Sequence, residues 1–210
     1  MTKNNVLYIF GNGISRKPID PSKLNGYIYG CNRFYQEYPS SDKIFVADQP
    51  MAKEILFSNF SGIVVYRHSL LSRAEVAEQI KEKPSWLPFK PEARGLAGKR
   101  QKGNYSSGAR ALIWAIHIDP LQRQKEWDEI YLLGFDFHNM KGQKPYKALN
   151  IYKGKEFYQQ DTSVGTGSDF QKQIDPYRKK FIRVVDDNTV LVKEGWNQLD
   201  IKEFMCKHLS

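Results

Sequence analysis

Short apolar runs recur along the first two thirds of the chain, and each run ends in turn residues. The first occupies 6–10, is rich in β-branched and aromatic residues, and stops at the Gly-Asn-Gly turn of 11–13. Runs of this length and composition are typical of strands that are buried on both faces of a sheet. The same pattern predicts strands at 27–32, 43–48, 62–66 and 127–133, and shorter ones at 181–185 and 190–192.

Helical patterns separate most of these strands. A proline near the first position favours a helix over 49–56, and the Ser-x-x-Glu sequence of 72–75 has the form of a capping box that opens a helix to about 81. The alternation of strands and helices predicts the α/β class: a single domain of 210 residues with a mostly parallel central sheet flanked by helices. Further helices are predicted at 109–117, 169–175 and 199–209.

The segment 84–103 breaks the alternation. It contains three prolines, several glycines and many cations, with Trp86 and Phe89 among them. We predict a long irregular excursion, a feature that is usually functional or disordered in compact domains. Cations mixed with aromatic rings suit contact with nucleic acid through phosphate charge and base stacking. The alternative is a solvated loop.

Composition narrows the functional classes. The net charge of +9 indicates a polyanionic partner, an anionic substrate, or only a soluble basic surface. No apolar run approaches the ~20 residues that a membrane-spanning helix needs, and the N-terminus does not have the form of a signal peptide. The two cysteines, Cys31 and Cys206, suit neither a metal site nor a disulfide framework, so we expect a cytoplasmic protein with Cys31 in the core.

Polar or small residues follow four of the predicted strands. Because the carboxyl ends of parallel strands lie at one edge of a sheet, these residues can meet in one crevice. The helix start at Ser106, Ser107 and Gly108 adds backbone amides suited to a phosphate. We therefore predict a mononucleotide site, although the Gly-x-Gly alone also fits a tight turn. The strand-end candidates are Gly11, Asn12, Gly13, Ser15, Asn32, Asp48, Gly134, Asp136 and His138.

Four short motifs in this order resemble the bacterial sialyltransferases of the Campylobacter lipooligosaccharide type, and similar phage and bacterial proteins. The likeness covers roughly 6–140. The motifs are Gly-Asn-Gly-x-Ser at 11–15, Cys-Asn-x-Phe at 31–34, Tyr-Ser-Ser-Gly at 105–108 and Ile-Tyr-Leu-x-Gly-x-Asp-Phe at 130–137.

The resemblance implies a Rossmann-like, metal-independent glycosyltransferase that uses a CMP-activated sugar and needs no cofactor. Asn12, Asn32 and Ser107–Gly108 would then hold the nucleotide, and Asp136 would support the site. The family has a tyrosine where this chain has His138, and a catalytic histidine further on, whereas here only His208 follows. We expect His138 to act as the base, with Asp136 and Asp161 as alternatives.

Five further residues are candidates for contact with a phosphate or the acceptor: Arg16, Arg33, Tyr146, Tyr152 and Tyr158. For the three tyrosines, packing is the alternative.

Two functions stay open. One is transfer of a sugar to a hydroxyl acceptor, either a glycan or modified DNA, and the other is binding of nucleotide or nucleic acid without turnover. The sugar, the acceptor and a homo-oligomeric state are not fixed by the sequence.

Overall fold

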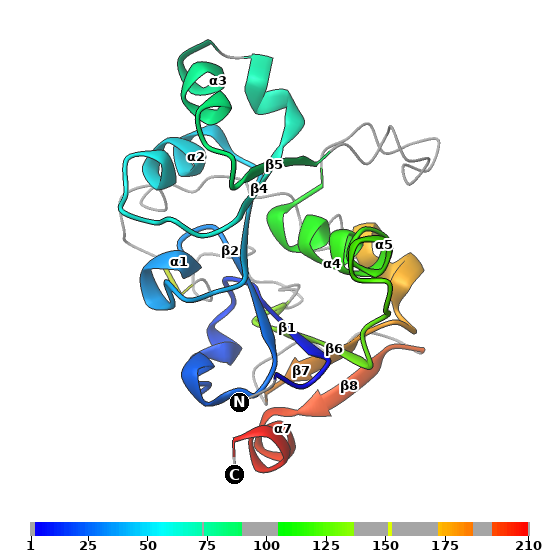
Figure 1. Ribbon diagram of the computed structural model, residues 1–210. Helices are drawn as coiled ribbons and strands as arrows, with labels where there is room; N and C mark the ends of the chain where they lie inside the picture. The colour runs from blue at the N-terminus through cyan, green and yellow to red at the C-terminus, as the bar shows by residue number, and fades with distance from the viewer. Residues whose placement is uncertain are drawn as a thin grey trace, which may run out of the picture.

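A computed structural model describes residues 3–72, 74–89, 105–136, 151–152, 172–186 and 195–209. Its eight strands form one sheet in the order β5-β4-β3-β2-β1-β6-β7-β8, and every neighbouring pair is parallel (Figure 1). The predicted α/β class with a parallel central sheet is confirmed. The strands are β1 Val6–Phe10, β2 Tyr27–Cys31, β3 Lys43–Val46, β4 Val64–Arg67, β5 Trp86–Phe89, β6 Glu129–Leu133, β7 Ile182–Val185 and β8 Asn197–Asp200.

Helices cover both faces of the sheet, since successive side chains of each strand point to opposite faces. Tyr8 and Phe10 of β1 pack with α1, α2, α3 and α7, whereas Leu7 and Ile9 pack with α4 on the other face. Figure 1 shows α1–α3 on one side of the strands and α4 and α5 on the other. The helices are α1 Phe34–Glu37, α2 Gln49–Leu56, α3 Ala74–Lys81, α4 Ser107–His117, α5 Asp119–Arg123 and α7 Ile201–His208, with 3-10 turns η1 Ile14–Arg16, η2 Pro21–Lys23, η3 His68–Ser72 and η6 Asp175–Tyr177.

The prediction of an irregular excursion over 84–103 is wrong in its first part. Trp86–Phe89 is strand β5, which pairs with β4 in parallel register. Pro88 is tolerated because β5 is the last strand of the described sheet, where a missing N–H breaks no ladder. Residues 90–103 lie outside the described residues, as does the strand predicted at 190–192.

Two smaller expectations concern the core and the membrane. Cys31 is buried at the end of β2, as predicted, and both cysteines are free. None of the helices in the described ranges is long and apolar enough to span a bilayer.

The C-terminal helix α7 is attached to the sheet through a histidine. Nδ1 of His208 lies 2.9 Å from the Tyr8 hydroxyl, and its ring centroid lies 4.7 Å from that of Tyr131. Burial lowers the pKa of His208; Lys207 lowers it further and Glu129 raises it in part. The folded protein therefore favours neutral His208.

Acid is expected to weaken the fold through this contact. Because the folded pKa lies below the unfolded value of about 6.5, the unfolded chain binds more protons, and stability falls as the pH drops through that value. His117, whose pKa is also lowered by burial, acts with the same sign. Urea unfolding at pH 7.5 and 5.0 should show a smaller acid loss in His208→Gln, whose amide still accepts from Tyr8. An equal loss in both proteins would contradict the assignment.

Candidate functional site

The turn after β1 is interlocked with the turn after β6. The Gly11 N–H donates to the Leu133 carbonyl and the Gly13 N–H to the Gly134 carbonyl, both at 2.8 Å. A Cβ at position 13 would lie 2.5 Å from the Gly134 oxygen and nearer still to the Asp136 carboxylate. The Gly134 carbonyl oxygen leaves no room for a Cβ at position 11 or 13, so both positions require glycine. This packing corresponds to the tight-turn interpretation of the Gly-x-Gly sequence.

Asp136 supports this interlock from the end of β6. Its buried carboxylate accepts the Ser15 N–H at 3.1 Å and also the Ser15 hydroxyl. Arg183 of β7, which is fully buried, donates to the Phe135 carbonyl at 2.8 Å and the Asp136 carbonyl at 3.1 Å. Burial lowers the pKa of Arg183 to about 10, although the charges of Asp136 and Asp186 oppose the shift. The predicted pair Ser15 and Asp136 therefore lies together, with Asp136 holding the turn.

Arg16 points into the protein. Its Nε donates to the Gly11 carbonyl at 2.6 Å, and its two terminal nitrogens each donate to the Glu37 carboxylate at 2.8 Å. Burial acts to lower the pKa of Arg16, but Glu37 and Tyr152 raise it above its usual value. The Tyr152 hydroxyl bonds to both Arg16 and Glu37, so these two predicted phosphate contacts bond to each other in this structure.

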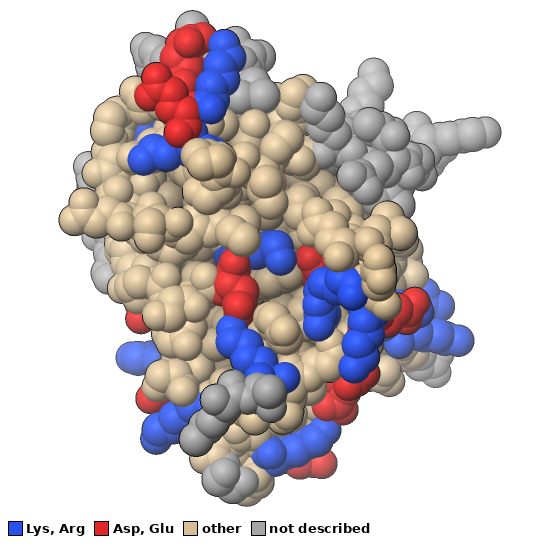
Figure 2. Space-filling view, viewed as in Figure 1, with Lys and Arg blue, Asp and Glu red and all other residues tan. Residues whose placement is uncertain are grey.

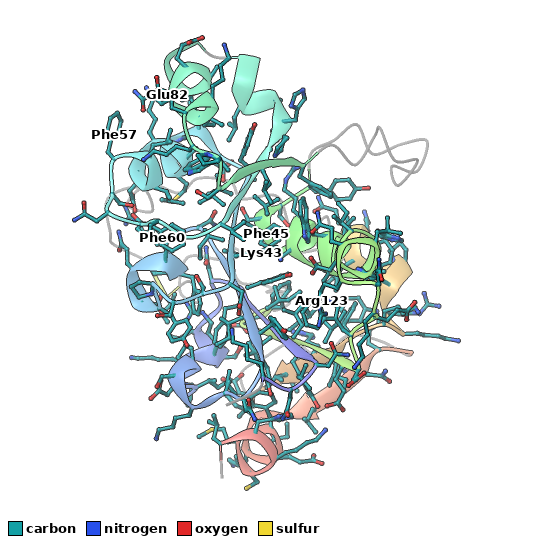
Figure 3. The ribbon with its side chains drawn as sticks, in the orientation of Figure 1. Lys43, Phe45, Phe57, Phe60, Glu82 and Arg123 are labelled. Carbon is teal, nitrogen blue, oxygen red and sulfur yellow. The ribbon has the colours of Figure 1, made fainter. Side chains whose placement is uncertain are left out.

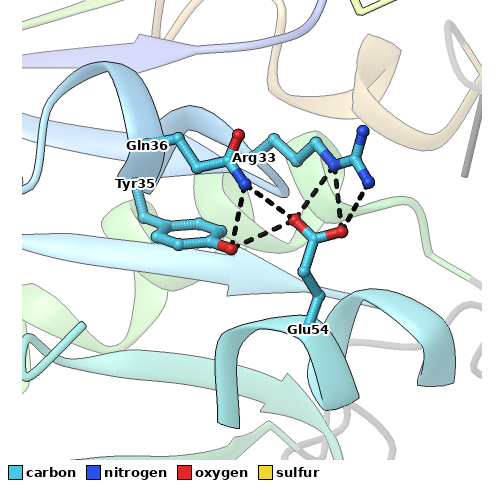
Figure 4. A network of polar contacts seen from close by, with 4 residues as sticks. All are labelled: Arg33, Tyr35, Gln36 and Glu54. Carbon is cyan, nitrogen blue, oxygen red and sulfur yellow. Dashed lines mark hydrogen bonds and ion pairs between the residues drawn. The ribbon is translucent and has the colours of Figure 1, made fainter. Parts of the chain in front are cut away.

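Arg33 joins two helices. Its guanidinium forms an ion pair with Glu54 of α2 at 2.6 Å, and the same carboxylate accepts from the Tyr35 hydroxyl and the Gln36 amide, both at 3.0 Å (Figure 4). Arg33 is buried. Its contacts with Glu54 connect α1 to α2.

Asn32 and the start of α4 meet at the carboxyl edge of β2. Asn32 has a φ of +55°, and its Oδ1 accepts from the Ser107 hydroxyl at 3.0 Å. Ser106 caps α4 by accepting the Ala109 N–H at 3.3 Å, while its own N–H donates to Gln173 at 3.0 Å. Two of the predicted nucleotide-binding groups, from positions 75 residues apart, are thereby in direct contact.

Two donors at the start of α4 are unused. Among the residues that the structure describes, no group accepts from the backbone N–H of Ser107 or of Gly108, and both residues are buried. The eleven-residue helix adds the positive end of its dipole, and Arg110 lies in its first turn. This helix end therefore combines the positive end of the helix dipole with two amides that point beyond the end of the helix.

Asp48 follows β3 at the same edge of the sheet. Its side chain is exposed and accepts no hydrogen bond within the described ranges. Although Asp48 reaches solvent, partial burial of its carboxylate raises its pKa, and the charges of Arg67 and Arg110 lower it in part. A carboxylate with open acceptor positions therefore faces the same edge as Asn32 and α4.

Several contributors were not anticipated. Gln173, Arg110 and Arg67 carry no motif, but Arg183 has a signal, because a cation inside an apolar strand needs buried partners. His138, Tyr146, Tyr158 and Asp161 lie outside the described residues. Over the described ranges, no three side chains of His, Cys, Asp and Glu converge as metal ligands would.

Comparisons with known proteins find likeness only among solved structures. No family model matches the sequence, and no curated protein matches it significantly. The sialyltransferase CST-II, solved with a trisaccharide acceptor and CMP, is 18% identical with a TM-score of 0.49, covering 85% of this chain and 79% of that one. The monofunctional α-2,3-sialyltransferase Cst-I from Campylobacter jejuni is 15% identical with a TM-score of 0.47, covering 98% and 79%. Both are sialyltransferases, the class that the four motifs resemble.

Proposed function

We propose that this protein is a metal-independent glycosyltransferase that binds a CMP-activated sugar at the carboxyl edge of β1–β3, beside the start of α4. The observation that carries the proposal is the pair of buried amides of Ser107 and Gly108, for which the described residues provide no acceptor. Buried N–H groups without acceptors are costly, and helix N-termini favour phosphate. A donor phosphate at this position would satisfy both amides.

Neighbouring groups suit the rest of a nucleotide. The open carboxylate of Asp48 can accept hydrogen bonds from ribose hydroxyls, as acidic residues at strand ends do in related sheets. Asn32 is held in place by Ser107. The choice of CMP rests on the sequence motifs that contain Asn12, Asn32 and Ser107–Gly108.

Transfer would break the bond between the anomeric carbon and the phosphate oxygen and form one to the acceptor oxygen. The leaving phosphate keeps the electron pair, and the α4 amides stabilise its charge. The acceptor proton passes to a base, for which His138 is our candidate. Asp136 is less suited to that task, because its carboxylate is buried and already accepts two hydrogen bonds from Ser15.

Replacement of Asn32 by glycine should weaken CMP binding at least tenfold, about 1.4 kcal/mol, and leave the fold nearly unchanged. Glycine adopts a φ of +55° without strain, so mainly the side chain is lost. Titration calorimetry with CMP, UDP and GDP measures the effect. Gln124→Gly is the matched control, since Gln124 also has a φ of +55° but ends α5.

Two outcomes would contradict the proposal: no binding of any of these nucleotides, or an equal loss of affinity in Gln124→Gly. Hydrolysis of the CMP-sugar then separates the two functions. CMP binding without turnover of any donor would replace the transferase by a nucleotide-binding module on the same site.

A further inference from the structure

A column of alternating cations and aromatic rings lies at the amino edge of the sheet, opposite the nucleotide site. The Lys3 ammonium lies 5.0 Å from the Tyr27 ring centroid. The Arg123 guanidinium lies 4.9 Å from the Tyr27 centroid and 3.5 Å from that of Trp127, and the two rings are 5.0 Å apart. These four residues are called the cation–aromatic column below. Figure 3 labels Arg123 and also Lys43, which begins β3 at this edge.

Arg123 makes no direct ion pair with a carboxylate within the described part of the chain. It is half-buried, and its Nη2 donates to the neutral Asn5 side chain at 2.6 Å. The two rings compensate only part of that charge. A half-buried guanidinium with this surrounding favours an external anion.

The neighbouring acids are already engaged. Asp42 pairs with Lys3 at 2.7 Å, and buried Asp119 pairs with Lys43 at 3.4 Å. Asp128 accepts from Asn5 at 2.8 Å, and Glu126 lies 3.9 Å from Lys180. Asp128 meets only the neutral amide of Asn5, so among these groups Arg123 is the cation without a direct carboxylate partner in the described residues.

Basic side chains extend from the column along the same edge. Figure 2 shows Lys and Arg side chains spread over the middle and lower part of this face, with acidic groups between them. Residues 178–180, Arg-Lys-Lys, precede β7 and so belong to the amino edge as well. The surface carries basic side chains interspersed with acidic ones, around two half-exposed rings.

We propose that the cation–aromatic column binds single-stranded nucleic acid, with Arg123 and Lys3 on phosphates and the half-buried Tyr27 and Trp127 against bases. Cations that follow a backbone together with rings that stack on bases are the recurring features of such surfaces. Stacking on the rings requires unpaired bases, so the rings favour single strands. Duplex DNA and lipid head groups present phosphates but no accessible base faces. The net charge of +9 draws such a polymer to the protein. This site does not depend on the proposed transferase function.

Anisotropy of a labelled 20-nucleotide DNA strand between 50 and 300 mM NaCl tests the proposal. In Lys3→Gln/Arg123→Gln, the slope of log K against log salt should become shallower by about 0.7 for each cation removed. The matched control is Lys81→Gln/Lys53→Gln, which removes the same charge from α3 and α2 (Figure 1). Trp127→Phe should weaken single-strand binding more than duplex binding.

Three outcomes would overturn the proposal: no binding at 50 mM NaCl, the same change of slope in the control pair, or binding to vesicles of 30% phosphatidylserine but not to DNA. Melting temperatures of each variant show that the fold is intact. The measurement contains no sugar nucleotide, and added CMP should not displace the strand. If no single strand binds, the proposed CMP site is not contradicted. If CMP does not bind, the test of single-strand binding is still valid.

Discussion

Gly13→Ala is expected to reduce the free energy of unfolding by about 3 kcal/mol, the upper range for overpacking a closed site. The backbone conformation is not the reason, since Gly13 has a φ of −71°, which alanine adopts freely. The cause is contact, because the new Cβ would press on the Gly134 oxygen at 2.5 Å and on the Asp136 carboxylate. For a chain of this size the melting temperature should fall by roughly 6–12 °C.

Gly195→Ala is the control for this result. Gly195 has a φ of +90°, but among the described residues the nearest atom to its new Cβ is the Arg178 Nε at 3.3 Å, on a side chain that can move. Backbone strain alone should cost about 1 kcal/mol there. If thermal unfolding shows Gly13→Ala to lose no more than Gly195→Ala, the two turns are not interlocked as described.

Asp136→Ala is expected to cost about 3 kcal/mol, measured by urea unfolding. The substitution leaves the buried Ser15 N–H and hydroxyl without their acceptor. It also removes a negative charge that favours the protonated form of the fully buried Arg183. Loss of a buried acceptor and of a compensating charge are both among the expensive changes in a protein interior.

Asp136→Asn separates these two contributions. The amide oxygen can accept the Ser15 N–H while the amide nitrogen donates to the Ser15 hydroxyl oxygen, so both contacts to Ser15 are kept, the charge is lost, and the hydroxyl changes from donor to acceptor. We expect about 1 kcal/mol for this variant. A loss as large as in Asp136→Ala would contradict the view that the bonds to Ser15 dominate.

The sheet was predictable because its strands are buried on both faces and therefore read as uninterrupted apolar runs. β1, β2 and α2 agree with their predicted ranges to within a residue. β5 was missed because Pro88 and the cations that follow it are typical of a loop. An edge strand tolerates the same residues. β8, with the sequence Asn-Gln-Leu-Asp, has no apolar alternation at all.

The location of the site was predictable, but the directions in which its side chains point were not. Topology alone brings Asn32 to the start of α4, since parallel strands end at one edge. Whether a polar side chain points to a ligand or into the protein depends on tertiary partners. Arg16 points inward because Glu37 meets it there, and Gln173 reaches Ser106 from 67 residues away with no local signal.

The pairing of β1 has a consequence for how the protein is made. β1 pairs on one side with β2, which begins 21 residues later, and on the other with β6, where Val6 meets Glu129. During synthesis the first five strands can associate early, while one edge of β1 waits for more than half of the chain to emerge. Long-range parallel pairing is slow, and an open apolar edge invites association with other chains. Nascent chains that end before β6 should therefore be the aggregation-prone species, and the step that protects them is the arrival of β6 beside β1.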